Sequence, residues 1–248
     1  MLHLQQFEMS RLKDIARKVV AGFPVPLTKN LAYDRQTTRV MKDALRETSN
    51  CIDIGCHKGE VLEEMLALAP KGRHFGFEPI PHYFTELGKK FPANCEFYQV
   101  ALSDSVGEIQ FNYVKTNPAF SGIKQREYPK EEQIELLTVK TDLLDNIIPG
   151  DVFIDLIKID VEGAEMQVLK GGESLIKRCQ PIIVFEHGIG AADHYGTHPA
   201  EVFDFLTDCG LLVNTMKRWI SEKEAFSRAE FEEQFTKQLN YYFMAYPG

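Results

Sequence analysis

The sequence predicts an α/β fold in one domain, with a seven-stranded, mostly parallel sheet, an antiparallel last strand and an N-terminal helical cap. From residue 50 onward, short apolar segments alternate with amphipathic helical segments, a pattern that implies right-handed crossovers between parallel strands. The chain has 248 residues and is 44% hydrophobic, which suffices for one sizeable core. The last apolar segment, YYFMAY, follows a charged stretch (221–240) too short for a compact parallel crossover, so we expect it to pair antiparallel at or near the sheet edge.

The first 49 residues are expected to form the helical cap. Residues 4–20 carry apolar side chains at helical spacing, and Val40 to Leu45 continue that spacing after a proline-containing break at 24–26. The N-terminal segment has charges every few residues and lacks the apolar run of a signal peptide.

The α/β core is expected to span residues 50–248 and to begin with two strand–helix units. The strand NCIDI precedes the helix EVLEEMLALA, whose first turn holds Glu60 and Glu63 and whose end is followed by Pro70. The strand RHFGFEP then leads into the helix PHYFTELGKK, and CEFYQVAL is expected to be the third strand.

An excursion from this alternation is expected over residues 108–141. EIQFNYV (108–114) and QIELLTVKT (133–141) alternate like hairpin strands, and the polar stretch 115–132 between them is interpreted as a surface loop or a lid. The strand–helix alternation then resumes with VFIDLIKID, a helix over 163–178, PIIVFEH, a helix over 198–209, and LLVNTMK.

The bulk composition favours a soluble cytoplasmic protein. The net charge of −8 argues against a nucleic-acid partner, and no apolar stretch is long enough for stable membrane insertion. Five scattered cysteines without a CxxC pair suit reduced thiols better than a disulfide frame or a zinc site. The sequence does not indicate an oligomeric state.

The turn after the first core strand indicates which cofactor the protein binds. Gly55 and Gly59 are spaced G-x-x-x-G, whereas a dinucleotide site requires G-x-G-x-x-G and a P-loop requires G-x-x-x-x-G-K-S/T. S-adenosylmethionine (SAM) has no phosphate and needs close backbone approach instead. Asp53 and Glu78 lie at the ends of successive strands, where Glu78 can accept hydrogen bonds from both ribose hydroxyls. The alternative is that these are ordinary turn glycines and an ordinary loop start.

The order of several motifs resembles one family. The chain contains YDRQT (33–37), IDIGCHKGE, FGFEPIP, VALSDSVGEIQF, IKIDVEGAEMQVLKGG and PIIVFEHG, and ends in YYFMAYP. Together they resemble the FkbM-type SAM-dependent methyltransferases over about residues 31–190, with IKIDVEGAE as the most specific motif. Cys56 departs from the small alanine more usual there. The resemblance implies a class I (Rossmann-like) methyltransferase fold and O-methylation of a sugar, lipid or secondary-metabolite hydroxyl.

The resemblance also implies a set of cofactor-binding residues. The cofactor loop would be formed by Asp53, Gly55, Cys56, His57 and Gly59, and the ribose would be bound at Glu78 and Pro79. The adenine would be flanked by Ala101, Leu102, Ser103 and Asp104, although Ser103 and Asp104 also suit a plain turn. Tyr33 and Gln36 would close over the cofactor or simply pack the N-terminal helix.

The expected catalytic residues follow two later strands. Asp160 ends the strand VFIDLIKID, and Lys158, two residues earlier on the same face, is expected to pair with it. Asp160, Glu162, Glu186 and His187 form the catalytic candidates, with His187 as the expected proton acceptor because a histidine beside carboxylates titrates near neutral pH. Asp160 would then lie near the methionine end of SAM. A divalent metal held by Asp160, Glu162 and His187 is the less favoured alternative.

The acceptor is expected to be a small hydroxylated molecule, with its pocket walled by the N-terminal 30 residues and the 115–132 stretch. Phe23, Phe120 and Tyr128 would supply its apolar surface or act as loop anchors. Two other functions compete with a methyltransferase: a binding protein that keeps the fold without catalysis, and, less favoured, a nicotinamide-dependent oxidoreductase.

Overall fold

The computed structural model describes residues 28–124 and 130–248. The expected helix over 4–20, the break at 24–26, and the wall residues Phe23 and Tyr128 lie outside the described residues. None of the described helices combines the length and the apolar character needed to cross a bilayer.

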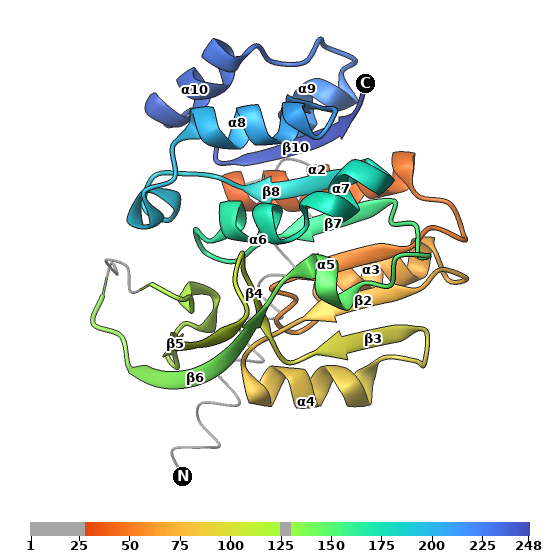
Figure 1. Ribbon diagram of the computed structural model, residues 1–248. Coiled ribbons are helices and arrows are strands. Elements are labelled where there is room, and N and C mark those ends of the chain that lie inside the picture. The colour runs from red at the N-terminus through yellow and green to blue at the C-terminus, as the bar shows by residue number, and fades with distance from the viewer. Residues whose placement is uncertain (1–27, 125–129) are drawn as a thin grey trace.

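The larger sheet has seven strands in the order β3-β2-β1-β7-β8-β10-β9 (Figure 1). The pairs β3–β2, β2–β1, β1–β7 and β7–β8 are parallel, whereas β10 runs antiparallel to both β8 and β9. The predicted sheet is therefore confirmed, with the last strand one position in from the edge. The strands are β1 (Cys51–Ile54), β2 (His74–Phe77), β3 (Cys95–Tyr98), β7 (Leu156–Ile159), β8 (Ile182–Glu186), β9 (Leu211–Asn214) and β10 (Tyr242–Pro247).

Helices cover both faces of this sheet because its strands are apolar on both sides. One face packs against α5 (Leu144–Ile147), α6 (Glu165–Gly171), α7 (Glu173–Cys179), α8 (Pro199–Asp208) and α10 (Arg228–Thr236). The other packs against α2 (Lys29–Ala44), α3 (Glu60–Leu68) and α9 (Met216–Ile220). α4 (Pro81–Lys90) contacts β3, and two short 3₁₀ turns are η1 (Pro118–Phe120) and η2 (Ala192–Tyr195).

The excursion forms a second sheet in the order β4-β6-β5. β5 (Gly107–Val114) and β6 (Ile134–Asp142) are the predicted antiparallel hairpin. The expected third strand CEFYQVAL is divided, however, because only its first half joins β2 as β3. Its second half, β4 (Ala101–Leu102), pairs in parallel with β6 and so links the two sheets.

The single helix expected over 163–178 is wrong: α6 ends at Gly171 and α7 begins at Glu173, with Gly172 between them. A Cβ on Gly171 would lie 2.1 Å from the backbone oxygen of Ser103, so this chain segment passes too close to the β4 end for any side chain. The helix is interrupted where the backbone makes that approach.

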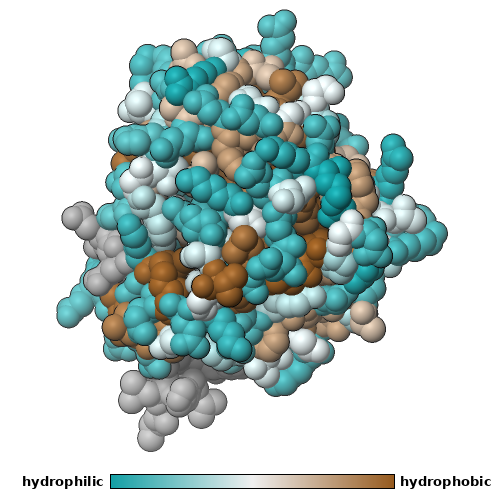
Figure 2. All heavy atoms as spheres, viewed as in Figure 1, coloured by the Kyte–Doolittle hydropathy of each residue, from teal (hydrophilic) through white to brown (hydrophobic). Residues whose placement is uncertain are grey.

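Most of the face seen in Figure 2 is hydrophilic, and hydrophobic side chains gather in patches on its lower half. The exposed large apolar residues of the described chain are dispersed over several elements, among them Leu136 on β6 and Phe153 before β7. Isolated exposed residues of this kind are usual on protein surfaces.

Candidate active site

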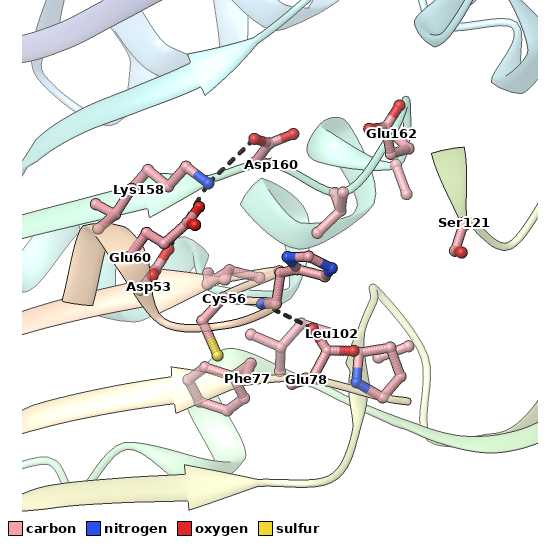
Figure 3. A pocket seen from close by; sticks show the side chains of 18 of the residues that line it. Asp53, Cys56, Glu60, Phe77, Glu78, Leu102, Ser121, Lys158, Asp160 and Glu162 are labelled. Carbon is pink, nitrogen blue, oxygen red and sulfur yellow. Dashed lines mark hydrogen bonds and ion pairs between the residues drawn. The ribbon is translucent and has the colours of Figure 1, made fainter. Parts of the chain in front are cut away.

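A pocket of about 430 Å³ opens where the C-terminal ends of β1, β2 and β7 meet. The carboxyl ends of parallel strands share one edge of a sheet, which is where α/β folds bind ligands. Figure 3 shows Glu78 on the β2 side of the pocket and Lys158 and Asp160 on the β7 side. The walls also include Tyr33, Asp34, Thr37 and Thr38 of α2, the turn from Asp53 to His57, Glu60 and Glu64 of α3, and Val100, Ala101 and Leu102.

The two glycines of the first turn serve different purposes. Gly55 lines the pocket with φ of +77°, and a Cβ on it would lie 2.0 Å from the backbone oxygen of Asp160. It therefore lets the ends of β1 and β7 touch. Gly59 has φ of +74° and precedes α3, but a Cβ there would meet the ring of Phe91 at 2.6 Å. Gly59 does not line the pocket, so its role in this structure is backbone conformation and packing.

Glu78 is held rigidly at the end of β2. Its Oε2 accepts a hydrogen bond from the backbone N–H of His57 at 2.8 Å, and its Oε1 accepts one from Ile80 at 2.9 Å. The side chain is 4% exposed, and this burial raises the pKa of its carboxyl to about 7 despite the two donors. The two hydrogen bonds fix the carboxylate orientation toward the pocket, as expected for a ligand-binding acid.

A chain of charged groups crosses the floor of the pocket. Asp53 and Lys158 occupy directly opposed positions on β1 and β7, and the Lys158 Nζ lies 3.8 Å from Asp53 Oδ1 and 3.1 Å from Asp160 Oδ2. Burial raises the pKa of Asp53 to about 6, although Lys158 opposes the rise. Burial also disfavours the charge on Lys158, but Asp160 and Asp53 outweigh it and raise the pKa of this amine. The expected Lys158–Asp160 pair is therefore present (Figure 3).

Only some of the residues expected to contact or cover the cofactor line the pocket. Ala101, Leu102 and Pro79 line the pocket, whereas Ser103 and Asp104 do not. The Ser103 backbone oxygen instead faces Gly171, and Asp104 is exposed. Tyr33 lines the pocket from α2, while Gln36 of the same helix does not. The 115–132 stretch contributes Pro118, Ser121 and Ile123 to the wall, but not Phe120.

His187 lies away from the pocket. It is 1% exposed, and its ring stacks on Phe235 and Phe231 of α10 at centroid distances of 4.7 and 6.0 Å. Its Nε2 has no hydrogen-bond partner among the described residues, and burial lowers the pKa of its imidazole to about 4. Neighbouring strand residues point to opposite faces, so His187 and Glu186 cannot both face the same site. This placement does not suit His187 as the base.

Asp160, Glu162 and Glu186 do come together. One carboxylate oxygen from each lies within 4.8 Å of the others, and all three side chains are half-buried. Glu162 takes a left-handed conformation with φ of +59°, which turns the chain after β7. Glu165, the first residue of α6, is buried beside this turn, and its Oε1 accepts hydrogen bonds from the N–H groups of Val161 and Gly163. Glu165 thus organises the turn.

Sequence reasoning missed Tyr242, whose hydroxyl donates a hydrogen bond to Asp160 Oδ2 at 2.7 Å. Tyr242 lines the pocket from the start of β10. The available signal was the antiparallel direction expected for YYFMAY, because the first residues of an antiparallel strand lie beside the last residues of its neighbours. It also missed Glu60, Glu64 and Phe77, which complete the wall.

Comparisons with known proteins show which family the chain resembles in sequence. Residues 53–212 match the model of the methyltransferase FkbM domain. The chain is 27% identical over 194 residues to the 2-O-methyltransferase NoeI of Sinorhizobium fredii, covering 71% of this chain and 77% of NoeI. It is 26% identical over 194 residues to the hexuronic acid methyltransferase AglP of Haloferax volcanii, covering 76% of this chain and 74% of AglP.

A solved structure supports the fold. The crystal structure of methyltransferase FkbM from Methylobacillus flagellatus superposes with a TM-score of 0.51 at 13% identity, covering 82% of this chain. The match spans 44% of that longer chain. The sheet order with its antiparallel β10 is that of the class I methyltransferase fold. The matched domain, residues 53–212, includes Glu78 and Asp160, which both line the pocket. The chain belongs to the FkbM methyltransferase family.

Proposed function

We propose that this SAM-dependent methyltransferase methylates a hydroxyl oxygen of a small, sugar-type acceptor. The observation that carries the proposal is that Glu78 at the end of β2 and Asp160 at the end of β7 face one pocket. The name of one relative, a 2-O-methyltransferase, supports methylation of an oxygen, and the name of the other, a hexuronic acid methyltransferase, supports a sugar-type acceptor.

The residues present fit SAM. The pocket volume of about 430 Å³ lies in the range of small-molecule sites. Gly55 brings backbone to the wall without a side chain, and Glu78 presents a fixed carboxylate that suits a ribose diol. We assign SAM to the turn Asp53–His57, to Glu78 and Pro79, and to Ala101 and Leu102 beside the adenine.

Asp160 replaces His187 as the proposed proton acceptor. When bound, SAM would supply an electrophilic methyl group for the acceptor oxygen, with the carbon–sulfur electron pair staying on sulfur, and Asp160 would accept the hydroxyl proton. Asp160 lines the pocket and is half-buried, and Lys158 holds its Oδ2. A positioned base of this kind contributes about 10²–10⁴ in rate.

A second candidate mechanism uses a divalent cation at the same edge. The spacing of Asp160, Glu162 and Glu186 would allow three oxygen ligands, the type that magnesium and manganese prefer. In that case the cation would acidify the acceptor hydroxyl. Dialysis against a strong chelator separates the two: full activity after chelation supports Asp160 as the base, and loss restored by magnesium or manganese supports the cation.

The proposed function is tested by binding and by transfer. Calorimetry should show binding of SAM and S-adenosylhomocysteine but not NAD. Labelled methyl transfer from SAM to a panel of neutral, amino and uronate methyl glycosides should then identify an acceptor hydroxyl. Asp160→Asn should keep SAM affinity and lose about 10²–10⁴ in kcat, whereas Asp151→Asn, at an exposed position before β7, should match the wild type. NAD binding without SAM binding would refute the proposal, and SAM binding without turnover would favour a non-catalytic binding protein.

A further inference from the structure

The chain after β5 returns to the pocket through residues 118–124. The 3₁₀ turn η1 brings it back beside β5, where Asn112 and Gly122 exchange two backbone hydrogen bonds of 2.9 and 3.2 Å. A Cβ on Gly122 would lie 3.5 Å from the Cβ of Glu162, so this loop also touches the turn after β7. The loop thereby forms a wall of the pocket, to which it contributes Pro118, Ser121 and Ile123.

Ser121 is the polar residue of this wall, and backbone contacts hold it in place. Its own N–H donates to the Pro118 oxygen at 3.1 Å, and its Oγ accepts a hydrogen bond from the Val114 N–H at 3.0 Å. The residue is only 8% exposed although it lines the pocket. Figure 3 shows Ser121 on a segment separate from the one that carries Asp160 and Glu162.

The Ser121 hydroxyl has a hydrogen-bonding function to spare. A serine hydroxyl can donate one proton as well as accept. Val114 uses its accepting side, and none of the residues in 28–124 and 130–248 accepts its proton. Buried polar groups are as a rule paired with protein, water or ligand. Because Ser121 lines the pocket, the partner for its proton is a molecule inside the pocket.

The surroundings of Ser121 suit a sugar better than SAM. SAM is assigned to the ends of β1 and β2 and to β4, whereas this loop touches the turn after β7, which follows Asp160. Pro118 and Ile123 place apolar surface on both sides of Ser121 along the loop. Ligand sites of this type combine apolar walls with a few fixed polar groups that set the ligand's orientation. A sugar offers both partners, since its C–H groups pack on apolar side chains and its hydroxyl oxygens accept hydrogen bonds.

We propose that Ser121 is a specificity-determining residue, which donates a hydrogen bond to a sugar hydroxyl other than the one that is methylated. By holding that hydroxyl, it selects which neighbouring hydroxyl is presented at the end of β7. The proposal deepens the proposed function and rests on it for the sugar-type acceptor. A site built to bind a hydroxyl discriminates against the analogue that lacks it, because its own polar group is then left unpaired.

The test combines Ser121→Ala with acceptors that lack one hydroxyl. The probes are the methyl glycoside that is methylated fastest in the transfer panel and its monodeoxy analogues. With Ser121→Ala, kcat/KM for the parent glycoside should fall about 2- to 12-fold, the value of one neutral hydrogen bond, while SAM affinity in calorimetry stays unchanged. One monodeoxy analogue should be poorer than the parent by a similar factor in the wild type and equal to it in the variant, because the same hydrogen bond cannot be lost twice.

Asn112→Ala is the control for a purely structural role of the loop. Asn112 is not among the residues that line the pocket, and its Nδ2 donates to the backbone oxygens of Gly122 and Ile123 at 3.3 and 3.0 Å. Loosening the loop in this way should affect the parent glycoside and all its monodeoxy analogues by the same factor. Only Ser121→Ala should single out one hydroxyl.

Three results with Ser121→Ala overturn the proposal: a wild-type kcat/KM, an equal loss on every acceptor, or weakened SAM binding, which would place Ser121 at the cofactor. If that variant does not fold, Ser121→Cys, of similar size but with a weak donor, decides by the same comparison. A panel in which no glycoside is methylated would sink the proposed function and this proposal together. Methylation without coupling between Ser121 and any hydroxyl would sink this proposal alone.

Discussion

Replacing Lys158 by methionine should destabilise the protein by about 3–5 kcal/mol at pH 7. Lys158 is 3.8 Å from Asp53 Oδ1 and 3.1 Å from Asp160 Oδ2, and the Asp53 side chain is only 1% exposed. At an effective dielectric constant of 20, the attraction at these distances is roughly 4–5 kcal/mol for each pair before the desolvation of the amine is subtracted. Methionine fills similar volume but leaves the buried Asp53 charge without its cation.

The loss should be smaller at pH 5 than at pH 7. The pKa of Asp53 is about 6 in the folded protein, above its usual value of about 3.9. The free energy of unfolding therefore declines as the pH rises from about 3.9 to about 6, because the unfolded chain releases this proton first. Without Lys158 that pKa rises further, and the decline continues to higher pH. Between pH 6 and pH 7 the variant should therefore lose about 1.4 kcal/mol that the wild type keeps.

Urea unfolding at both pH values measures the effect. The control is Lys170→Met, an exposed lysine in the last turn of α6, which should stay within about 0.5 kcal/mol of the wild type. A loss below about 1 kcal/mol for Lys158→Met at pH 7, or an equal loss at the two pH values, would refute the view that Lys158 neutralises buried Asp53.

Three other substitutions test the site. Glu78→Ala should weaken SAM binding by about 1.5–3 kcal/mol in calorimetry, because a charged acceptor for the ribose hydroxyls is lost; unchanged affinity would place the ribose elsewhere. His187→Leu should retain methyl transfer and unfold at an equal or higher temperature, since the imidazole is buried against phenylalanines with an unpartnered nitrogen; a large fall in kcat would restore His187 as a candidate base. Gly55→Ala should lower the yield of folded protein and the melting temperature, because its Cβ would lie 2.0 Å from the Asp160 oxygen at a positive φ; a wild-type melting temperature would contradict that contact.

The sequence by itself determined the sheet and the acids at its edge. Asp53, Glu78 and Asp160 could be assigned to one site because the carboxyl ends of parallel strands gather on one side, whatever the details of packing. Lys158 could be paired with Asp160 because residues two apart on a strand share a face. These inferences need only strand direction and alternation, which are local properties of the chain.

The tertiary structure decided which neighbours actually face the pocket. Alternation along the strand directs His187 to the face opposite that of Glu186. Only the packing of α10 on that face shows that His187 lies in a closed apolar layer. Gly59 resembles a cofactor glycine in sequence, but in the structure a side chain at this position would clash with the ring of Phe91, which follows α4. Tyr242 reaches Asp160, 82 residues earlier in the chain, because β10 is inserted antiparallel between β8 and β9. Long-range pairing of this kind leaves no local pattern in the sequence, so these roles emerge only when the strands are assembled.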